Sequence, residues 1–179
     1  MNNSCKIFKA LTQEICDTYV GGIAKVAFAN WDKNHEFTES SGSCIVDTIV
    51  LANDEHAYEV DVNEESTFFN VNLNDNTTFK NYTHLIEGTI GFINCDVLNA
   101  YKEWSLGKLI AFVLTNDGEV YALGVDNGLS ATQFDIASGT AKSDGGGITF
   151  HFEGIQKETA KKIKNWEIVE ALYPTQNNG

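Results

Sequence analysis

Alternating apolar and polar residues recur along the chain and predict β-strands. In residues 69–74, Phe69, Val71 and Leu73 alternate with three asparagines. Successive side chains of a strand point to opposite faces, so this pattern predicts an antiparallel strand with one buried face. Alternation or β-branched runs predict further strands at residues 23–30, 44–51, 58–62, 83–93 and 148–153. Within residues 83–93, Gly88 and Gly91 permit a bend or a bulge.

In residues 94–107 the spacing of apolar residues changes from that of a strand to that of a helix. These residues predict a single helix of about ten residues. Four apolar side chains share one helix face, at spacing i, i+1, i+4 and i+7: Val97, Leu98, Tyr101 and Trp104. Asn94 or Asp96 can cap the start of this helix, and Gly107 suits a left-handed position after its end.

A β-hairpin is predicted after the helix. Two β-rich runs, residues 108–115 and 119–125, flank the sequence Asn-Asp-Gly at 116–118. Asp-Gly between two such runs favours a tight turn. Residues 126–128 repeat this turn chemistry, and residues 129–137 lead into a polar, glycine-rich loop at 138–147. We expect this loop and residues 33–43 to be flexible.

These patterns predict an all-β, mainly antiparallel fold of the sandwich or barrel type, with one flanking α-helix. The end of the chain differs, because residues 156–179 combine four lysines with a helix-compatible stretch at 159–172. We therefore expect a β domain at residues 1–155 and a C-terminal extension at 156–179. The extension is expected to be helical or bound to a partner, with a frayed tip.

Charge restricts the classes of partner. The 179 residues carry a net charge of −13, from 25 acidic and 12 basic side chains. This excess argues against general nucleic-acid binding and against binding to an anionic membrane. We expect neither a targeting segment nor a membrane anchor. The four cysteines form no CxxC pair and are expected to be reduced and mostly buried: Cys5, Cys16, Cys44 and Cys95.

The sequence predicts no catalytic, metal-binding or cofactor-binding residues, and we expect the protein not to be an enzyme. The four histidines lack the spacing that places two metal ligands on one helix face: His35, His56, His84 and His151. We expect His84 and His151 on the solvent face of strands or in strand pairs. The glycine-rich loop precedes a strand, whereas a phosphate-binding loop requires a helix.

Two acidic pairs, Asp54-Glu55 and Glu64-Glu65, are also set aside as catalytic groups. Adjacent residues on a strand point apart and cannot form a catalytic carboxylate pair. We expect both pairs to be solvated charges at loop edges.

Residues 118–154 resemble a stretch common in tail tube and related tail proteins of phages that infect Bacteroidetes. The family pattern is a strand ending in Leu-Gly, a turn, a glycine-rich loop and a last strand of the Thr-hydrophobic-Phe type. The matching residues are Leu123-Gly124, Asp126-Asn127-Gly128, Ser138-Gly139-Thr140-Ala141, Asp144, Gly147 and Thr149-Phe150. The front of the chain is similar as well, at Cys5, Cys16, Val20-Gly21-Gly22-Ile23 and Asn30-Trp31-Asp32. Residues beyond Gly154 depart from the shorter family members.

The resemblance implies a tail-tube-like β-sandwich or barrel and a structural role in the virion. Such subunits close into hexameric rings by joining strands, and the rings stack into the tube through which DNA passes without specific binding. It implies other copies of the chain and further tail or connector proteins as partners. It places the protein in the virion tail, assembled in the bacterial host cytoplasm.

Other interpretations remain open. Within assembly proteins, the chain could form a tail terminator, a head–tail connector ring or the tube of a contractile injection system. A different class is a β-sandwich module that binds carbohydrate or serves adhesion. That class needs clustered exposed aromatic residues, whereas Trp31, Trp104 and Trp166 are dispersed along the sequence.

Overall fold

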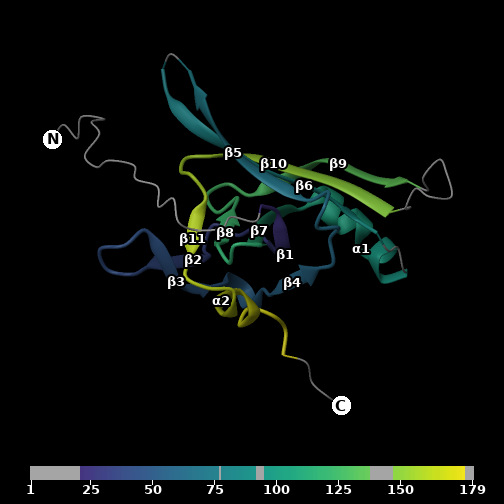
Figure 1. Ribbon diagram of the computed structural model, residues 1–179, viewed down its shortest axis with the longest axis horizontal. Coiled ribbons are helices and arrows are strands. Elements are labelled where there is room, and N and C mark those ends of the chain that lie inside the picture. Colours follow the sequence, from purple (N-terminus) through teal and green to yellow (C-terminus); the bar gives the residue numbers. More distant parts are fainter. Residues whose placement is uncertain (1–20, 77, 92–94, 138–146, 176–179) are drawn as a thin grey trace.

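The computed structural model describes residues 21–76, 78–91, 95–137 and 147–175. These residues form an all-β, mainly antiparallel fold with one three-turn helix beside it, as the sequence predicted (Figure 1). The strands are β1 (Ile23–Asn30), β2 (Glu36–Glu39), β3 (Ile45–Val50), β4 (Ala57–Val60), β5 (Phe68–Asp75), β6 (Lys80–Ile90), β7 (Lys108–Thr115), β8 (Val120–Leu123), β9 (Leu129–Ala137), β10 (Gly147–Gln156) and β11 (Lys161–Ile163). The helices are η1 (Ala52–Asp54), α1 (Cys95–Leu106) and α2 (Glu167–Glu170).

Strand β7 is central to the topology because it pairs with three other strands. Along one edge it pairs with β1, whose other edge carries β4. Along the opposite edge, residues 111–114 pair with β8 and residues 108–109 pair with β9. Two arms begin there, β8-β11-β3-β2 and β9-β10-β6-β5. We call the second arm the four-stranded sheet. It lies across the top of Figure 1, where its β5–β6 hairpin projects beyond the rest of the molecule.

Two apolar cores lie on opposite faces of β1 and β7. Phe28 belongs to the core that faces the four-stranded sheet, and its ring centroid lies 5.9 Å from that of Phe150. Phe112 belongs to the second core, which β3, β8, β11 and α2 complete. Burial on both faces explains why residues 109–114 read as an uninterrupted apolar run instead of alternating.

The predicted helix and turns are present, with two local differences. Gly118 and Gly128 have φ values of 84° and 72°, which confirms both turns. Helix α1 packs Trp104 against the first core, but Leu98 is 48% exposed. Gly107 does not take a positive φ, because its N–H continues the helical bonding to the Glu103 carbonyl (2.9 Å) and β7 begins at the next residue. Asn94 and the side chains of Asp96, Val97 and Tyr101 lie outside the described residues.

The helix expected over residues 159–172 is wrong for most of its length. Residues 161–163 form β11, which pairs with β3 and β8, and α2 comprises a single turn. The reason is tertiary: Ile163, Trp166 and Val169 are buried in the second core. Because β10 ends at Gln156 and β11 completes the other arm, residues 156–175 are part of the β fold.

Ion pairs with a carboxylate of β2 and with two carboxylates outside the strands hold β11 in place. Lys161 Nζ lies 3.0 Å from a carboxylate oxygen of Glu39 and 3.2 Å from one of Glu158. Burial alone lowers the pKa of Lys161, but these two carboxylates outweigh that effect and raise it. Lys162 pairs with Glu119, whose hydrogen bond raises the pKa of Lys162.

Residues 33–43, expected to be flexible, contain strand β2. This strand pairs with β3, and the Phe37 ring stacks on Phe112 at 6.4 Å. Residues 129–137, assigned to no strand from the sequence, form β9. Of the glycine-rich loop, residues 138–146 lie outside the described ranges.

The expected burial of the cysteines is wrong at both described positions. Cys44 and Cys95 are exposed. Each lies at the border of an element: Cys44 immediately precedes β3 and Cys95 begins α1. Cys5 and Cys16 lie outside the described residues.

Candidate assembly surface

The four-stranded sheet has two open edges in the described part of the chain. Strand β5 pairs with β6 along its length, and its other edge meets no strand. Strand β9 pairs with β10, but with β7 only through Leu129 and Ser130. On that side, residues 131–137 of β9 form no ladder with another strand in the described ranges. Unpaired edges offer backbone N–H and C=O groups to another strand.

The strand directions make these two edges mutually compatible. Neighbouring strands in the order β9-β10-β6-β5 are antiparallel throughout. After three reversals, β5 runs opposite to β9. A second copy placed beside the first in the same orientation therefore brings its β9 antiparallel to the free edge of β5, and the sheet continues without a break in its pattern.

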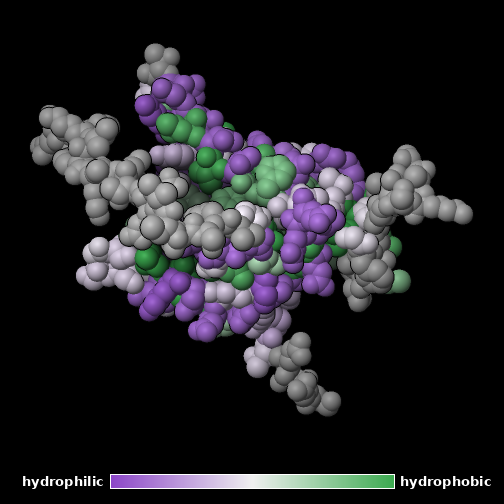
Figure 2. Space-filling model, viewed as in Figure 1, coloured by the Kyte–Doolittle hydropathy of each residue, from purple (hydrophilic) through white to green (hydrophobic). Residues whose placement is uncertain are grey.

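Exposed apolar side chains accompany both edges. On the β5 side, Leu73 is 53% exposed and Phe79, at the tip of the hairpin, is 58% exposed. On the β9 side, Ile136 is 49% exposed, and α1, which packs against β9, exposes Leu106 at 75%. Figure 2 shows apolar side chains on the projecting hairpin, surrounded by hydrophilic ones. Exposed apolar groups beside an open strand edge favour protein–protein contact.

The outward face of the four-stranded sheet is largely polar. The register places alternate residues outward, opposite buried residues such as Ile86 and Phe152. The outward polar side chains include Asn70, Asn72, Asn74, Asn81, Thr83, Glu87, Thr89, Ser130, Gln133, Asp135, Thr149, His151 and Glu153. Phe68, Leu85 and Ile155 are the apolar side chains on the same face. Among these outward positions there are carboxylates but no lysine, so the face is anionic.

Cross-strand hydrogen bonds order this polar face. His151 lies between two carboxylates, with Nδ1 3.1 Å from Glu87 Oε2 and Nε2 3.4 Å from Glu153 Oε2. The strand-pair role expected for His151 is thereby confirmed. Nearer the hairpin tip, Asn74 Nδ2 donates to Asn81 Oδ1 at 2.9 Å and to Thr83 Oγ1 at 2.6 Å.

His84 lies on the inward face of β6, so the solvent-face position, one of the two roles expected for it, is wrong. Its side chain is 2% exposed, because it lies in phase with the buried Ile86. Gly124 N–H donates to Nδ1 at 3.2 Å, and Nε2 donates to the carbonyl oxygen of Glu158 at 2.9 Å. Burial lowers the pKa of His84, which favours this neutral form.

Gln156 forms a second buried polar connection at the same end of the sheet. It is 1% exposed. Its Oε1 accepts the Asn127 N–H at 2.9 Å, and its Nε2 donates to the Gly128 carbonyl at 2.9 Å. Together with His84 it fixes the end of the four-stranded sheet to the turn after β8.

The other residues considered as chemical candidates are hydrogen-bonded within the fold or exposed to solvent. His35 accepts the Ala52 N–H at Nδ1 (2.8 Å). Glu55 accepts a hydrogen bond from Asn30, and Glu64 and Glu65 lie exposed in the loop before β5. Across the described ranges, no three His, Cys, Asp or Glu side chains come together as metal ligands. None of the described helices is long and apolar enough to cross a membrane.

Sequence reasoning assigned Leu73 to a buried strand face and missed its exposure. The alternation is real, because Leu73 shares the inward face with Phe69 and Val71, which pack against the first core. The hairpin, however, extends beyond that core, so Leu73 remains 53% exposed although it lies on the inward face. Periodicity identifies a face but not how far the opposite layer reaches.

Comparison of the chain with protein-family models and with curated protein sequences finds no match.

Proposed function

We propose that this protein is a structural subunit of a bacteriophage tail. Its copies assemble into rings that form the tail tube or an adjoining ring, and DNA passes through the lumen. The observation that carries the proposal is the pair of compatible open edges, β5 and residues 131–137 of β9, on one four-stranded sheet. The sequence resemblance to tail tube proteins supports the same role.

In the proposed ring, β5 of each copy pairs with β9 of the next. Because the two edges are different surfaces, this contact is head-to-tail, and head-to-tail contacts close into rings when the rotation between copies permits. The exposed apolar residues beside each edge, such as Leu73 and Ile136, become buried between copies. Closure removes both open edges, which a lone subunit leaves liable to non-specific pairing.

The dimensions of such a ring suit DNA. Six copies that each contribute this sheet form a barrel of about 24 strands. With a strand spacing of about 4.8 Å and a tilt of about 40°, the backbone diameter is roughly 48 Å. Side chains on the inner wall reduce the opening by roughly 10 Å, which leaves a lumen wider than a DNA duplex.

The outward polar face of the sheet forms the lumen wall in this proposal. Glu87, Asp135 and Glu153 give each copy carboxylates on that face. Like charge repels the phosphates of DNA, so the genome can pass without adhering. The opposite face of the same sheet covers the first apolar core and therefore has to point away from the lumen.

The experiment compares assembly of the purified protein with that of three single variants. Leu73→Glu and Ile136→Glu place a charge beside one edge each, whereas Val50→Glu places the same charge at a similarly exposed position (52%) on β3. Light scattering and electron microscopy should show rings or tubes for the wild type and for Val50→Glu, and monomers with unchanged circular dichroism for the two edge variants. A wild-type protein that stays monomeric over a wide concentration range, or edge variants that assemble normally, would rule out the proposed ring.

A further inference from the structure

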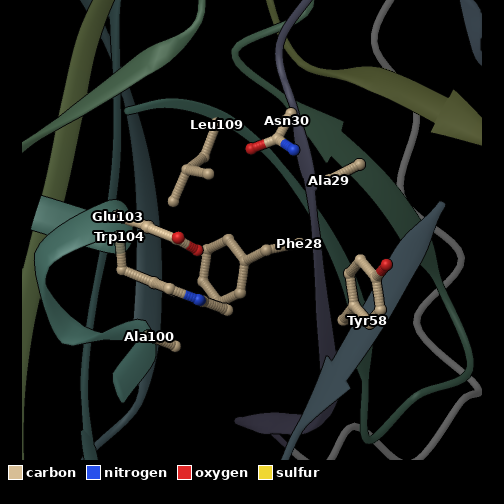
Figure 3. Close-up of a pocket in the computed structure, with 8 residues that line it drawn as sticks. All are labelled: Phe28, Ala29, Asn30, Tyr58, Ala100, Glu103, Trp104 and Leu109. Atoms are coloured by element: carbon tan, nitrogen blue, oxygen red, sulfur yellow. The ribbon is translucent and has the colours of Figure 1, made fainter. Parts of the chain in front are cut away.

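A cavity lies between helix α1 and the paired strands β1 and β4. Its volume is about 390 Å³, within the range of small-molecule sites. Figure 3 shows side chains from both sides that border it. The lining residues are Phe28, Ala29, Asn30, Tyr58, Ala100, Glu103, Trp104 and Leu109.

Three aromatic side chains line this cavity. Phe28 is 2% exposed and meets Trp104 edge-on, with ring centroids 5.2 Å apart and an interplanar angle of 76°. Tyr58 is the cross-strand partner of Phe28 and remains 51% exposed. The Phe28 ring is fixed by further contacts with Phe150 and Phe152, so this part of the cavity wall is rigid.

Two of the polar groups at the cavity, a carboxylate and an amide oxygen, are hydrogen-bond acceptors. Glu103 supplies a carboxylate from α1. The Asn30 amide nitrogen donates to Glu55 Oε2 at 2.9 Å, so that a second carboxylate lies next to the cavity and the amide oxygen of Asn30 remains an acceptor. None of the lining residues is basic. The net charge of −13 adds a general attraction for cations.

We propose that this cavity is a binding site for a small organic cation of the alkylammonium class. Aromatic rings attract such cations through their negative faces, and a neighbouring carboxylate adds a counter-charge. Trp104 and Tyr58 provide the aromatic contact, the buried Phe28 ring supports Trp104 from behind, and Glu103 provides the counter-charge. None of the lining residues belongs to β5 or β9, so the inference does not depend on ring assembly.

The test titrates the full-length protein with choline and with its neutral, isosteric analogue 3,3-dimethylbutan-1-ol. Saturation-transfer NMR suits this titration because it also works on large assemblies. We expect choline to bind with roughly millimolar affinity and the neutral analogue to bind about tenfold more weakly. Glu103→Gln and Tyr58→Leu should each weaken choline binding at least about fivefold, and Tyr58→Phe should retain it.

Glu65→Gln is the matched control for charge, because Glu65 is exposed in a loop away from the cavity. This variant should bind choline like the wild type. Equal binding of choline and its neutral analogue would overturn the cationic specificity. Absence of choline binding at about 50 mM, or binding that Glu103→Gln and Tyr58→Leu leave intact, would overturn the site itself.

Discussion

The buried imidazole of His84 on β6 donates from Nε2 to the carbonyl oxygen of Glu158, 2.9 Å away in the segment after β10. The Gly124 N–H donates to the other ring nitrogen. Protonation of that nitrogen would prevent it from accepting the hydrogen bond from Gly124. The connection between the four-stranded sheet and the turn after β8 therefore requires a neutral His84.

Stability should accordingly depend on pH through His84. Burial lowers the pKa of His84 in the folded protein below its ordinary value of 6.5. Below about pH 6.5 the unfolded chain binds a proton that the folded chain does not, so the free energy of unfolding falls as the pH decreases. Above that pH the contribution is complete. Urea titrations between pH 5 and 8 measure this dependence.

Two variants isolate the contribution of His84 to this dependence. His84→Gln should be less stable at every pH and should lose most of the slope between pH 5 and 6.5, whereas His56→Gln keeps His84 and should retain the slope. The same slope in His84→Gln and in the wild type would show that other groups cause it.

Gly88 and Gly91 should respond differently to the same substitution. A Cβ at Gly88 would lie 2.5 Å from Thr67 Oγ1 and 2.9 Å from Phe150 Cζ, whereas a Cβ at Gly91 meets nothing within 4 Å. Overpacking at a buried position costs about 1–3 kcal/mol. Gly88→Ala should therefore lower the free energy of unfolding by about that amount, and Gly91→Ala, which meets no atom of the described residues, should change it by less than about 0.5 kcal/mol. Similar denaturation midpoints for both variants would contradict the packing described at Gly88.

The C-terminal segment should contribute to folding, since Ile163 is 1% exposed in the second core. Removing buried aliphatic groups of this size costs about 2–5 kcal/mol. We expect Ile163→Ala to destabilise the protein by this amount in urea denaturation. Lys164→Ala, at an exposed neighbouring position, should have an effect within about 0.5 kcal/mol. Equal stability of the two variants would mean that residues 156–175 are dispensable for the fold.

Sequence patterns predicted an element best where that element packs one face against a single core. Alternation located β5, β6 and β10, and the Asp-Gly turn located the β7–β8 hairpin, because these patterns report directly on local geometry. They failed in the C-terminal segment. There, Ile163, Trp166 and Val169 have a spacing of three that suits a helix, yet each fills a gap in a core built by distant strands. Tertiary packing thus overrode local preference.

The candidate assembly surface could be anticipated only in part. The resemblance implied rings that form by joining strands, but which edges remain open depends on the branching at β7, where β8 and β9 share one side of the strand. Sequence periodicity carries no information on that branching. The cavity beside α1 was not foreseen either, because Tyr58 and Glu103 come together only through the packing of a helix against β1.

The anionic face should determine whether the assembled protein adheres to DNA. Replacing both Glu87 and Glu153 by lysine reverses charge on the proposed lumen wall, whereas replacing Glu36 and Glu167 makes the same change on β2 and α2, away from that face. We expect the first variant to retain DNA at low salt at least about tenfold more strongly than the second, and to lose it as salt increases. Filter binding measures both affinities, and equal retention would argue that this face does not meet DNA.

The proposed ring depends on a contact between β5 of one copy and β9 of the next. A double variant, Asn72→Cys and Gln133→Cys, places a thiol beside each open edge, on the outward face of the sheet. The native cysteines are replaced by serine in this variant. Within one copy the two thiols lie at least three strand spacings apart, about 14 Å or more, which a disulfide cannot span.

Mild oxidation of this variant, followed by denaturing electrophoresis, tests the contact directly. We expect a ladder of covalent oligomers that ends at about six copies, and no cross-linking in either single-cysteine variant, because a head-to-tail contact joins unlike edges. Dimers formed by a single-cysteine variant, or a double variant that stays monomeric at every concentration, would contradict the account.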